Sequence, residues 1–392
     1  MRSGFKAGRV FGIDIFIDWS WLFIFFLIIW DLGTSFSQIH PSWGPGLVWG
    51  TGIIAAILFF VSVLAHELAH SLVARSQGIP VRSITLFLFG GVSDIQREPQ
   101  SPRAEFLITI VGPITSIILG LIFLWLGGTT AGALDSVTGS SFAMTQLGPW
   151  ATIALWLGSI NILLGIFNLI PGFPLDGGRI LRSILWAITG NLQRATRWAS
   201  LVGQIVAWLF IIAGITMIFG ARIPLLGAGI INGLWIAFIG WFLNSAAIQS
   251  YQQLVVHDIL GHVPVSRLMR SNPPTVPSTA TISALVHDHI MGTDDYAFPV
   301  VDNGQLVGMV TINDIRSVPR EQWDTKTVGE IMTPSSKLVI ATPEEDAADA
   351  LDKLSERDVR QLPVVRNGQL AGILRRRDIM RWLQLQSNMQ LT

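Results

Sequence analysis

The motif His66-Glu67-Leu68-Ala69-His70 brings two imidazoles and a carboxylate together in the sequence. Residues four positions apart lie on one face of a helix, so both histidines can bind one metal ion while Glu67 lies beside it. Two ligands and a general base in this spacing are typical of metal-dependent hydrolysis. Ionisable side chains near a bilayer cost about 2.5 to 3.5 kcal/mol each and are rarely placed there without a role. We therefore predict a metal site, rather than a chance match in a packed helix.

Asp176 is the best candidate for a third metal ligand. Catalytic zinc usually has three protein ligands and one position left for water, and the chain contains no cysteine that could provide a thiolate. Pro171 and Pro174 break the preceding helix, and two glycines follow Asp176 and allow a close backbone approach. Taken alone, an Asp beside two glycines is more often a turn residue. Asn168 is expected either to donate to a developing oxyanion or to satisfy the broken helix end.

These residues predict a specific reaction. Zinc would polarise a bound water, Glu67 would accept its proton, and the hydroxide would attack a peptide carbonyl. The interior of a bilayer is dry, so this reaction needs a polar cavity that is open to the cytosol.

The elements that carry these residues are predicted to be membrane helices. Half of the residues are hydrophobic (50%) and few are charged (13%), which is typical of a membrane protein. Stretches of roughly 20 apolar residues, long enough to cross a bilayer, occur six times. They centre on residues 19–36, 47–65, 106–126, 152–170, 199–219 and 228–247.

Basic residues predict the orientation of these spans, because loops rich in Arg and Lys stay on the cytoplasmic side. They gather before the first span, between the second and third, and between the fourth and fifth, whereas the other connections contain only Arg222. We therefore expect a multi-pass protein of the cell membrane with its N-terminus, its active-site opening and its C-terminal domain in the cytoplasm.

Two segments of the membrane domain are predicted to be extended. Residues 10–18 alternate apolar and polar side chains, and residues 81–89 are β-branched and aromatic before Gly90 and Gly91. A hairpin or re-entrant loop fits the second segment. Non-helical backbone at that depth must be buried in protein or line a cavity.

The chain changes character after residue 250, where short strands alternate with short helices in a duplicated pattern. Residues 298–308 match residues 362–372 at an offset of 64, and Leu268-Met269 and Ile331-Met332 open the two copies. Such a duplication predicts two β/α modules that pack on each other. We expect a membrane domain at 1–250, a linker at 251–263 and modules at 264–320 and 327–386.

Together these motifs resemble the site-2 protease family of intramembrane metalloproteases. The resemblance rests on the His66 to His70 motif, the segment Phe89-Gly-Gly-Val-Ser, Gly112-Pro113 and residues 168–178, and the duplicated tail resembles a pair of cystathionine-β-synthase-type (CBS) domains. It implies one zinc ion bound by His66, His70 and Asp176, with Glu67 as base and Asn168 near the oxyanion. It also implies single-span substrates, such as anti-sigma factors or signal-peptide remnants, and a strand edge near residues 86–89 that presents them.

The CBS resemblance implies an adenine nucleotide site in each module. Thr311 and Asp314 match the hydroxyl and the acid that hold phosphate and ribose, whereas Arg375 replaces the hydroxyl before Asp378. The second site is therefore expected to be weakened, or adapted to more phosphate through neighbouring arginines. The alternative is a structural pair that dimerises, in which both acids only cap helices.

Two other functions compete with the protease. A transporter gated by the CBS pair would need repeat symmetry and charges along a pore, and the sequence contains neither. A silent relative would bind substrate without cleaving it, yet all four chemical residues are present. The balanced net charge gives no reason to expect a nucleic-acid partner. Small residues at Gly112, Ser116 and Gly120 are expected to mark helix contacts rather than chemistry.

Overall fold

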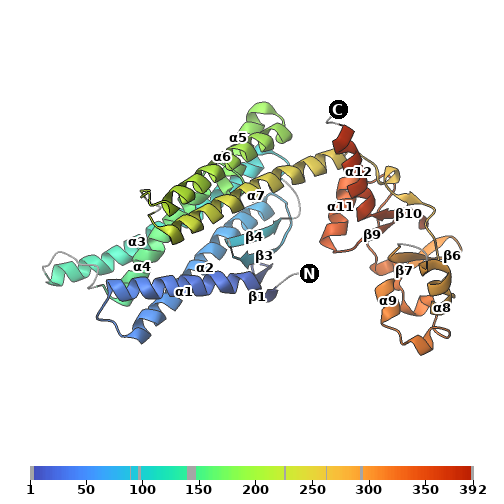
Figure 1. The fold of residues 1–392 in the computed structure, drawn as a ribbon, viewed down its shortest axis with the longest axis horizontal. Helices are drawn as coiled ribbons and strands as arrows, with labels where there is room; N and C mark the ends of the chain where they lie inside the picture. Colours follow the sequence, from blue (N-terminus) through green and yellow to red (C-terminus); the bar gives the residue numbers. More distant parts are fainter. Residues whose placement is uncertain are drawn as a thin grey trace. The chain divides into compact units, whose positions relative to one another are not determined.

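The structure is a computed structural model that describes the chain except for residues 1–3, 89, 96–98, 139–146, 225–226, 262, 292–294 and 390–392. The chain divides into two compact units, Met1–Gln252 and Gln253–Thr392. The first unit is built mainly from long helices and the second from short strands and helices (Figure 1).

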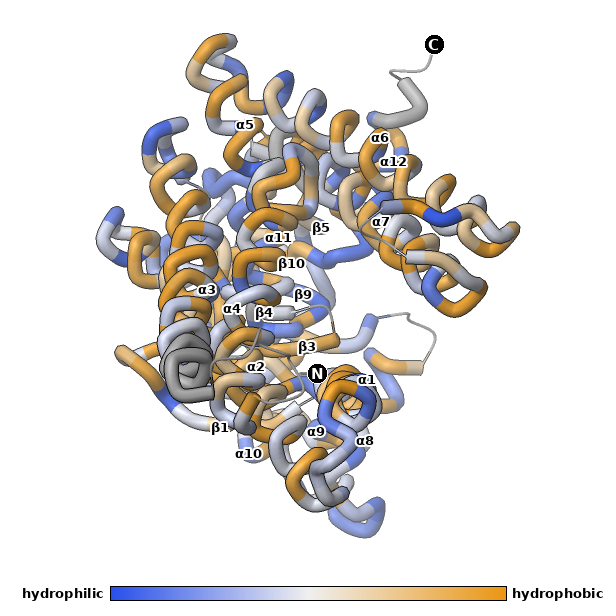
Figure 2. Tube along the Cα trace, turned by 90° about the vertical axis from the view of Figure 1, so that its left-hand side faces the viewer, coloured by the Kyte–Doolittle hydropathy of each residue, from blue (hydrophilic) through white to orange (hydrophobic). Residues whose placement is uncertain are grey.

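Six helices of the described residues are long and apolar enough to cross a membrane. The prediction of about six spans is therefore confirmed, and Figure 2 shows hydrophobic residues along much of α2 and α3. A shorter amphipathic helix, α5, lies between the fourth and fifth spans and was not predicted. The helices of this unit are α1 (Trp19–Ile39), α2 (Pro45–Ser76), α3 (Pro102–Thr138), α4 (Pro149–Asn168), α5 (Asp176–Thr189), α6 (Leu192–Ile218) and α7 (Ile230–Leu260).

Close helix packing builds the interior of the first unit. Leu32 of α1, Ala55 of α2 and Leu157 of α4 belong to one buried cluster. A methyl group added at Gly120 of α3 would lie 2.6 Å from Ile162, and one at Gly158 of α4 would lie 2.6 Å from Leu124. The predicted helix contact at Gly120 is therefore present, because only small residues allow α3 and α4 to approach this closely.

A four-stranded sheet packs against α2 and α3. Its strands are β1 (Gly4–Val10), β2 (Ile13–Asp18), β3 (Val81–Phe87) and β4 (Gly90–Ile95), in that spatial order. Strands β1 and β2 form an antiparallel hairpin, β2 and β3 run parallel, and β3 and β4 run antiparallel. Ile13, Ile15 and Ile84 are buried in one cluster with Ala74 of α2 and Ile108 of α3.

The order of the strands corrects one expectation. Leu86 of β3 pairs with Ile17 on one side and with Gly91 on the other. Since both of its edges are occupied, β3 cannot present an edge to a substrate. The outer strand on this side is β4. Phe89, at the end of the predicted edge, lies outside the described residues.

The second unit contains the two predicted β/α modules. In each module a two-residue Asn-Gly turn with positive φ joins a pair of antiparallel strands, at Asn303-Gly304 and at Asn367-Gly368. The first module contains β6 (Ala297–Asp302), β7 (Gln305–Thr311), α8 (Ile282–Leu285) and α9 (Ile312–Arg316); the second contains β9 (Gln361–Arg366), β10 (Gln369–Arg375), α11 (Ala347–Glu356) and α12 (Arg376–Met389).

The segments that open the two modules are exchanged between them. β5 (Arg270–Ser271) pairs with β10 of the second module, and Met269 packs on the core of that module. Likewise β8 (Thr333–Pro334) pairs with β7, and Met332, which follows α10 (Val328–Ile331), packs on the first module. Residues 251–260, expected to form a linker, are instead the last turns of α7, and Leu260 is buried in the core of the second module.

Candidate active site

Helix α2 carries both histidines near its C-terminal end. His66 and His70 are buried, with 5% and 7% of their surface exposed, and their Nε2 atoms lie 3.0 Å apart. Residues four positions apart share a helix face, so the two imidazoles point into the same space. Glu67 follows His66 on the same turn and lies at the side of the pair.

Asp176 completes the cluster from the other half of the unit. It is the first residue of α5, and its Oδ2 lies 3.1 Å from Nε2 of His66 and 3.2 Å from Nε2 of His70. Among the described residues these three side chains form the group of His and acidic residues that could hold a metal ion. The structure therefore brings together the three predicted ligands, from segments more than 100 residues apart.

The outer nitrogens of both histidines already have partners. Nδ1 of His70 lies 2.7 Å from the carbonyl oxygen of Ile108, and Nδ1 of His66 lies 2.9 Å from Oγ of Ser116. A carbonyl can only accept, so Nδ1 of His70 donates and Nε2 is the ring nitrogen left to face Asp176. The two Nε2 atoms and Oδ2 of Asp176 all lie within 3.0–3.2 Å of one another, and one proton can join only one pair of them, whereas a single cation can contact all three. The donor set therefore fits one zinc ion, whose tetrahedral ligands at about 2.0–2.1 Å would lie about 3.3 Å apart.

Two glycines make space for the catalytic side chains. A methyl group added at Gly112 of α3 would lie 2.1 Å from Nε2 of His70 and 2.7 Å from Nε2 of His66. One added at Gly91 of β4 would lie 2.4 Å from Cγ of Glu67. Any other residue at these positions would need the histidines or Glu67 to move.

A serine of the sheet orients Glu67. Oγ of Ser93, on β4, donates to Oε2 of Glu67 at 2.8 Å. Ser71 lies one turn beyond Glu67 on α2 and donates to Oγ of Ser93 at 3.1 Å. The open-edge strand and the acid beside the histidines are thus joined by a chain of hydroxyl groups.

A buried ion pair fixes the helix that carries Asp176. Nε of Arg182, on α5, donates to Oε1 of Glu105, on α3, at 2.6 Å, and the two side chains are 5% and 1% exposed. The guanidinium of Arg182 also lies 5.5 Å from the ring centroid of Phe173, in the turn before α5. This pair therefore holds α5 against the helix that carries Gly112 and Ser116.

Asn168 occupies a different setting from the three ligands. It is the last residue of α4, and its amide donates to the carbonyl oxygen of Leu164 at 3.1 Å. Within the part of the chain that the structure describes, no hydrogen bond joins it to the His-Asp cluster. Its assignment to the oxyanion stays a prediction.

Three supporting groups were missed by the sequence analysis: Ser93, Ser116 and the carbonyl of Ile108. Ser116 was expected to mark only a helix contact, but it is fully buried and is bound to His66. Its hydroxyl lies one helical turn after Gly112 in an otherwise apolar helix, and this was the signal available for it. Ser93 could have been found through its place in the Gly-Gly-Val-Ser segment.

The three residues predicted to bind nucleotide lie at helix starts in the second unit. Thr311 and Asp314 form a reciprocal capping box at the start of α9. At the equivalent place in the second module, both oxygens of Asp378 accept from Arg375, at 2.6 and 3.0 Å. These hydrogen bonds raise the pKa of the Arg375 guanidinium above its ordinary value. Arg375 therefore stands where the first module has a hydroxyl residue, and it binds both carboxylate oxygens of Asp378.

Comparisons with known proteins agree with this architecture. Residues 54–211 match peptidase family M50, and residues 265–321 and 328–385 match the CBS domain. The chain is 33% identical to Rip3 of Mycobacterium tuberculosis over 98% of this chain and 94% of that protein, and 29% identical to zinc metalloprotease MJ0392 of Methanocaldococcus jannaschii over 98% and 97%. A solved site-2 protease from the latter organism is 26% identical, covers 63% of this chain and 95% of its own, and superimposes with a TM-score of 0.41.

The likeness to Rip3 extends over both units of the chain, so it covers the helices with the His-Asp cluster as well as the duplicated modules. The chain therefore belongs to peptidase family M50, the site-2 protease family of zinc metalloproteases, as a multi-pass membrane member with a C-terminal pair of CBS domains.

Proposed function

We propose that this chain cleaves transmembrane segments of other proteins at a single zinc ion held by His66, His70 and Asp176. The observation that carries the proposal is the convergence of these three side chains, with Glu67 beside them, in a unit of six candidate spans. The outer nitrogens of the histidines are already bound, which leaves their Nε2 atoms for the metal.

Bound zinc supplies a Lewis acid that lowers the pKa of a water molecule toward neutrality. Glu67 is assigned as the base that takes the proton of this water and later returns it to the leaving amine. Ser93 holds Oε2 of Glu67 in place, so the other carboxylate oxygen is the one assigned to proton transfer. Asn168 is proposed to stabilise the oxyanion, which requires its amide to leave the carbonyl of Leu164.

The substrate is proposed to bind as an extended strand along β4. A transmembrane helix hides its peptide bonds, whereas an extended segment exposes them and can add to an open sheet edge. β4 is the outer strand, and its Gly91 and Ser93 both contact Glu67. Single-span membrane proteins such as anti-sigma factors, and signal-peptide remnants, are the substrate class that we propose.

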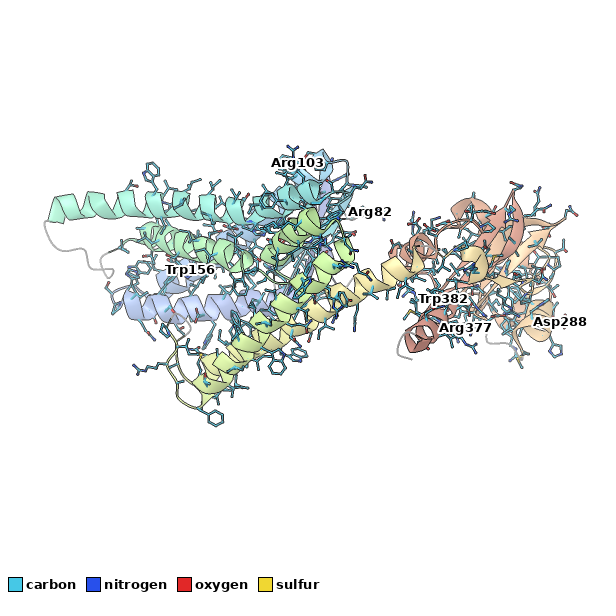
Figure 3. All side chains as sticks on the ribbon, turned by 90° about the horizontal axis from the view of Figure 1, so that it is seen from above. Arg82, Arg103, Trp156, Asp288, Arg377 and Trp382 are labelled. Atoms are coloured by element: carbon cyan, nitrogen blue, oxygen red, sulfur yellow. The ribbon has the colours of Figure 1, made fainter. Side chains whose placement is uncertain are left out.

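The site is proposed to open to the cytoplasm, with the N-terminus and the CBS pair on the same side. Figure 3 places Arg82 and Arg103 at one end of the helical unit, away from Trp156. Basic residues gathered at one end favour that end as cytoplasmic. The chain has no cysteine, so single cysteines introduced at Arg103 and at Arg222 can be labelled in intact cells. Labelling of the first but not the second by an impermeant reagent would contradict this orientation.

The CBS pair is proposed to regulate access to the active site. Thr311 and Asp314 of the first module are the residues assigned to an adenine nucleotide, and the pair is also proposed to join two copies of the chain. We expect cleavage by a chain that ends at Ser250 to differ in rate from cleavage by the full chain. Equal rates, with and without adenine nucleotide, would count against regulation.

The decisive test measures zinc content and cleavage of a transmembrane substrate in detergent. We expect about one zinc per wild-type chain, as for a three-ligand catalytic site. Glu67→Gln should retain zinc, and its cleavage rate should fall about 10²- to 10⁴-fold, which is the usual contribution of a general base to the rate. Asp176→Ala should lose zinc affinity as well. Wild-type protein without zinc would overturn the proposal, whereas zinc without cleavage of any substrate would favour a silent binder.

A further inference from the structure

The hairpin of β1 and β2 turns through a residue that this type of turn disfavours. Strand pairing leaves Phe11 and Gly12 as its two central residues, and their φ angles are 49° and 78°. Both angles are positive, as a type I′ turn requires, and asparagine followed by glycine is the usual pair. A bulky side chain in this left-handed region is strained, because its Cβ lies too close to the following carbonyl oxygen.

The two hairpins of the second unit use the usual pair instead. Asn303-Gly304 and Asn367-Gly368 adopt similar angles, with φ of 51° and 53° at the asparagines. Phe11 stands where these hairpins have asparagine, and burial does not compensate its strain, since 69% of its surface is exposed. Strain of this kind persists only where the surrounding structure imposes it, and it marks a candidate functional position.

Two arginines hold the strained turn in place. Nη1 of Arg75, in the last turn of α2, donates to the carbonyl oxygen of Phe11 at 2.5 Å, and Nη2 of Arg9 donates to that of Gly12 at 3.2 Å. Each guanidinium has five N–H groups and gives one of them to these carbonyls. The turn therefore presents an exposed ring beside two cations that can donate further hydrogen bonds.

Positive charge exceeds negative charge around this turn. The carboxylate of Asp14 lies 2.8 Å from Nζ of Lys6 and 3.6 Å from Nε of Arg9, so two cations share it. Arg75 has no carboxylate partner in the part of the chain that the structure describes. The side chains of Lys6 and Arg9 are at least half exposed, so the turn offers positive charge to an anion outside the protein.

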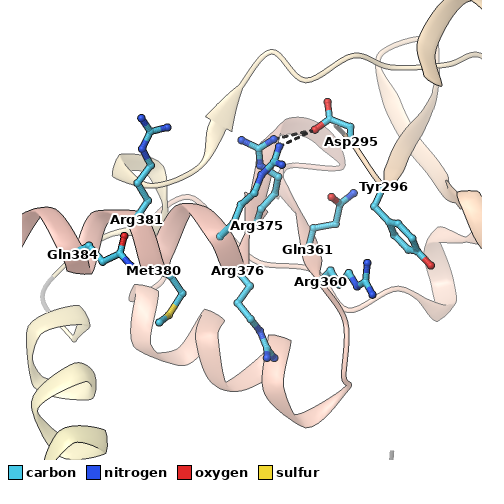
Figure 4. Close-up of a pocket in the computed structure, with 10 residues that line it drawn as sticks. Asp295, Tyr296, Arg360, Gln361, Arg375, Arg376, Met380, Arg381 and Gln384 are labelled. Carbon is cyan, nitrogen blue, oxygen red and sulfur yellow. Dashed lines mark hydrogen bonds and ion pairs between the residues drawn. The ribbon is translucent and has the colours of Figure 1, made fainter. Parts of the chain in front are cut away.

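A second group of arginines belongs to a site already predicted. Around the start of α12, five arginines line a cleft of about 870 Å³, which we call the arginine cleft (Figure 4). Asp378, predicted to bind nucleotide, accepts from one of them. The hairpin differs from this cleft because its cations flank an exposed ring. The arginines of the cleft are Arg360, Arg375, Arg376, Arg377 and Arg381.

The hairpin continues an aromatic surface of the first candidate span. Four aromatic residues of α1 recur at helical spacing and are exposed, namely Trp19, Phe23, Phe26 and Trp30. Exposed aromatic side chains on a membrane span contact lipid. Phe5 of β1 is also exposed, and its ring centroid lies 5.7 Å from that of Trp19. The lipid-facing surface of α1 therefore extends onto the hairpin.

We propose that the hairpin binds the surface of the bilayer, with Phe11 inserted among the headgroups and Arg9 and Arg75 bound to phosphates of anionic lipids. Aromatic side chains favour the interface of a bilayer, and basic residues are attracted to an anionic one. Figure 3 places Arg82, on the neighbouring strand β3, at one end of the helical unit, where headgroups lie. A soluble protein is the competing partner, and the continuity with α1 favours lipid. Because Arg75 and His70 share α2, this contact sets the depth of the His-Asp cluster in the membrane.

Fluorescence quenching in lipid nanodiscs tests this contact in the full-length chain, without zinc or substrate. The chain has no cysteine, so Phe11→Cys carries a label at this turn and Asn303→Cys carries one at the matching turn of the second unit. We expect lipids with a spin label near the headgroup to quench the first label and not the second, and more strongly when phosphatidylglycerol is present. No quenching at residue 11 would overturn the inference and favour a protein partner. Equal quenching of both labels would show that the label itself enters the bilayer, which also contradicts it.

A charge variant tests the role of the arginines in the same experiment. Arg75→Gln in the chain labelled at residue 11 should lower the ratio of quenched to unquenched label about fivefold, which corresponds to the attraction of one basic residue to an anionic surface. Arg103→Gln, an exposed arginine at the start of α3, is the matched control and should leave the ratio unchanged. An equal fall in both variants, or no fall in Arg75→Gln, would contradict the assigned lipid contact.

Phe11→Asn separates lipid binding from folding. Asparagine suits the left-handed conformation, so the amides of the hairpin should exchange about fivefold more slowly than in the wild type when the chain is in a neutral detergent. In nanodiscs with phosphatidylglycerol the same variant should exchange faster than the wild type, because it lacks the inserted ring. Slower exchange in both media would show that Phe11 contributes only strain, and faster exchange in both would show that its ring packs on the protein. Either result would rule out the lipid contact.

Discussion

The His-Asp cluster of the helical unit and the arginine cleft of the second unit differ in how exposed their side chains are and in how firmly hydrogen bonds hold them. In the cluster, the side chains of His66, His70 and Asp176 are between 6% and 16% exposed, and hydrogen bonds hold both outer nitrogens. In the cleft, Arg377 is 52% exposed and several guanidinium groups have no carboxylate partner among the described residues. A site that must position atoms for bond cleavage needs rigid neighbours, whereas a site that attracts charge can tolerate mobile side chains. We therefore expect single substitutions to have large effects at the cluster and small ones in the second unit.

The largest effect is expected for Gly112→Ala. The added methyl group would lie 2.1 Å from Nε2 of His70, so zinc content and cleavage should both fall to background. Gly128→Ala on the same helix is the control, because an added methyl group there meets nothing within 4 Å. Metal analysis and a cleavage assay measure both variants. Normal zinc in Gly112→Ala would mean that the cluster is less tightly packed than we infer.

Glu105→Gln should reduce stability strongly. It removes the negative charge that Glu105 places against the buried guanidinium of Arg182, and breaking one partner of a buried ion pair costs about 3–5 kcal/mol of the free energy of unfolding. The double variant Glu105→Gln/Arg182→Gln should lose less than the single one, because it removes the buried guanidinium together with the carboxylate. Denaturation of the purified chain in detergent measures both. Equal losses would show that shape, rather than charge pairing, holds α5 to α3.

Ser116→Ala should weaken zinc binding about 10- to 100-fold, the usual cost of removing a group that orients a metal-bound histidine. Competition with a chelator gives the zinc affinity directly, so the effect can be read without an activity assay. Thr115→Ala is the matched control, since the hydroxyl of Thr115 donates to Val111 of its own helix at 2.8 Å. Loss of zinc affinity of the same size in both variants would point to disturbed helix packing instead.

Thr311→Ala should have the smallest effect of this series. It removes one half of the capping box at the start of α9 and should cost about 1 kcal/mol of local stability. Hydrogen exchange of the α9 amides in the full-length chain measures this cost. Thr325→Ala, at an exposed turn, should leave exchange unchanged. A loss of cleavage in Thr311→Ala without any change in exchange would show that the hydroxyl acts through a ligand and not through the cap.

Short-range sequence patterns predicted the features that depend on residues close together in the chain. Apolar length alone identified the six spans, and helical spacing identified His66 and His70 as a pair. Asp176 was found because the prolines and glycines around it mark a bend in an otherwise apolar stretch. The repeat located both modules, since the Asn-Gly turns fix the same hairpin in each copy.

Contacts between distant segments were the parts that could not be predicted. Nothing in the β-branched and aromatic composition of residues 81–89 indicates that β3 pairs on both sides, which moves the open edge to β4. The exchange of Met269 and Met332 between modules depends on which strand each opening segment joins, and the duplicated sequence is equally consistent with either pairing. Ser116 was assigned to helix packing because its place one turn after Gly112 indicates a close helix contact but does not identify the imidazole that it meets.

The position of α5 also sets the order in which the active site can form during synthesis. Asp176 follows His70 by 106 residues, and Arg182 follows Glu105 by 77. A chain still on the ribosome therefore inserts both histidines and a buried glutamate before either of their partners exists. When α5 arrives, the metal cluster and the ion pair close together, so zinc loading and neutralisation of Glu105 become one late event in membrane assembly. A chain truncated before α5 would lack both Asp176 and Arg182, so we expect it to bind zinc more weakly than the full chain does.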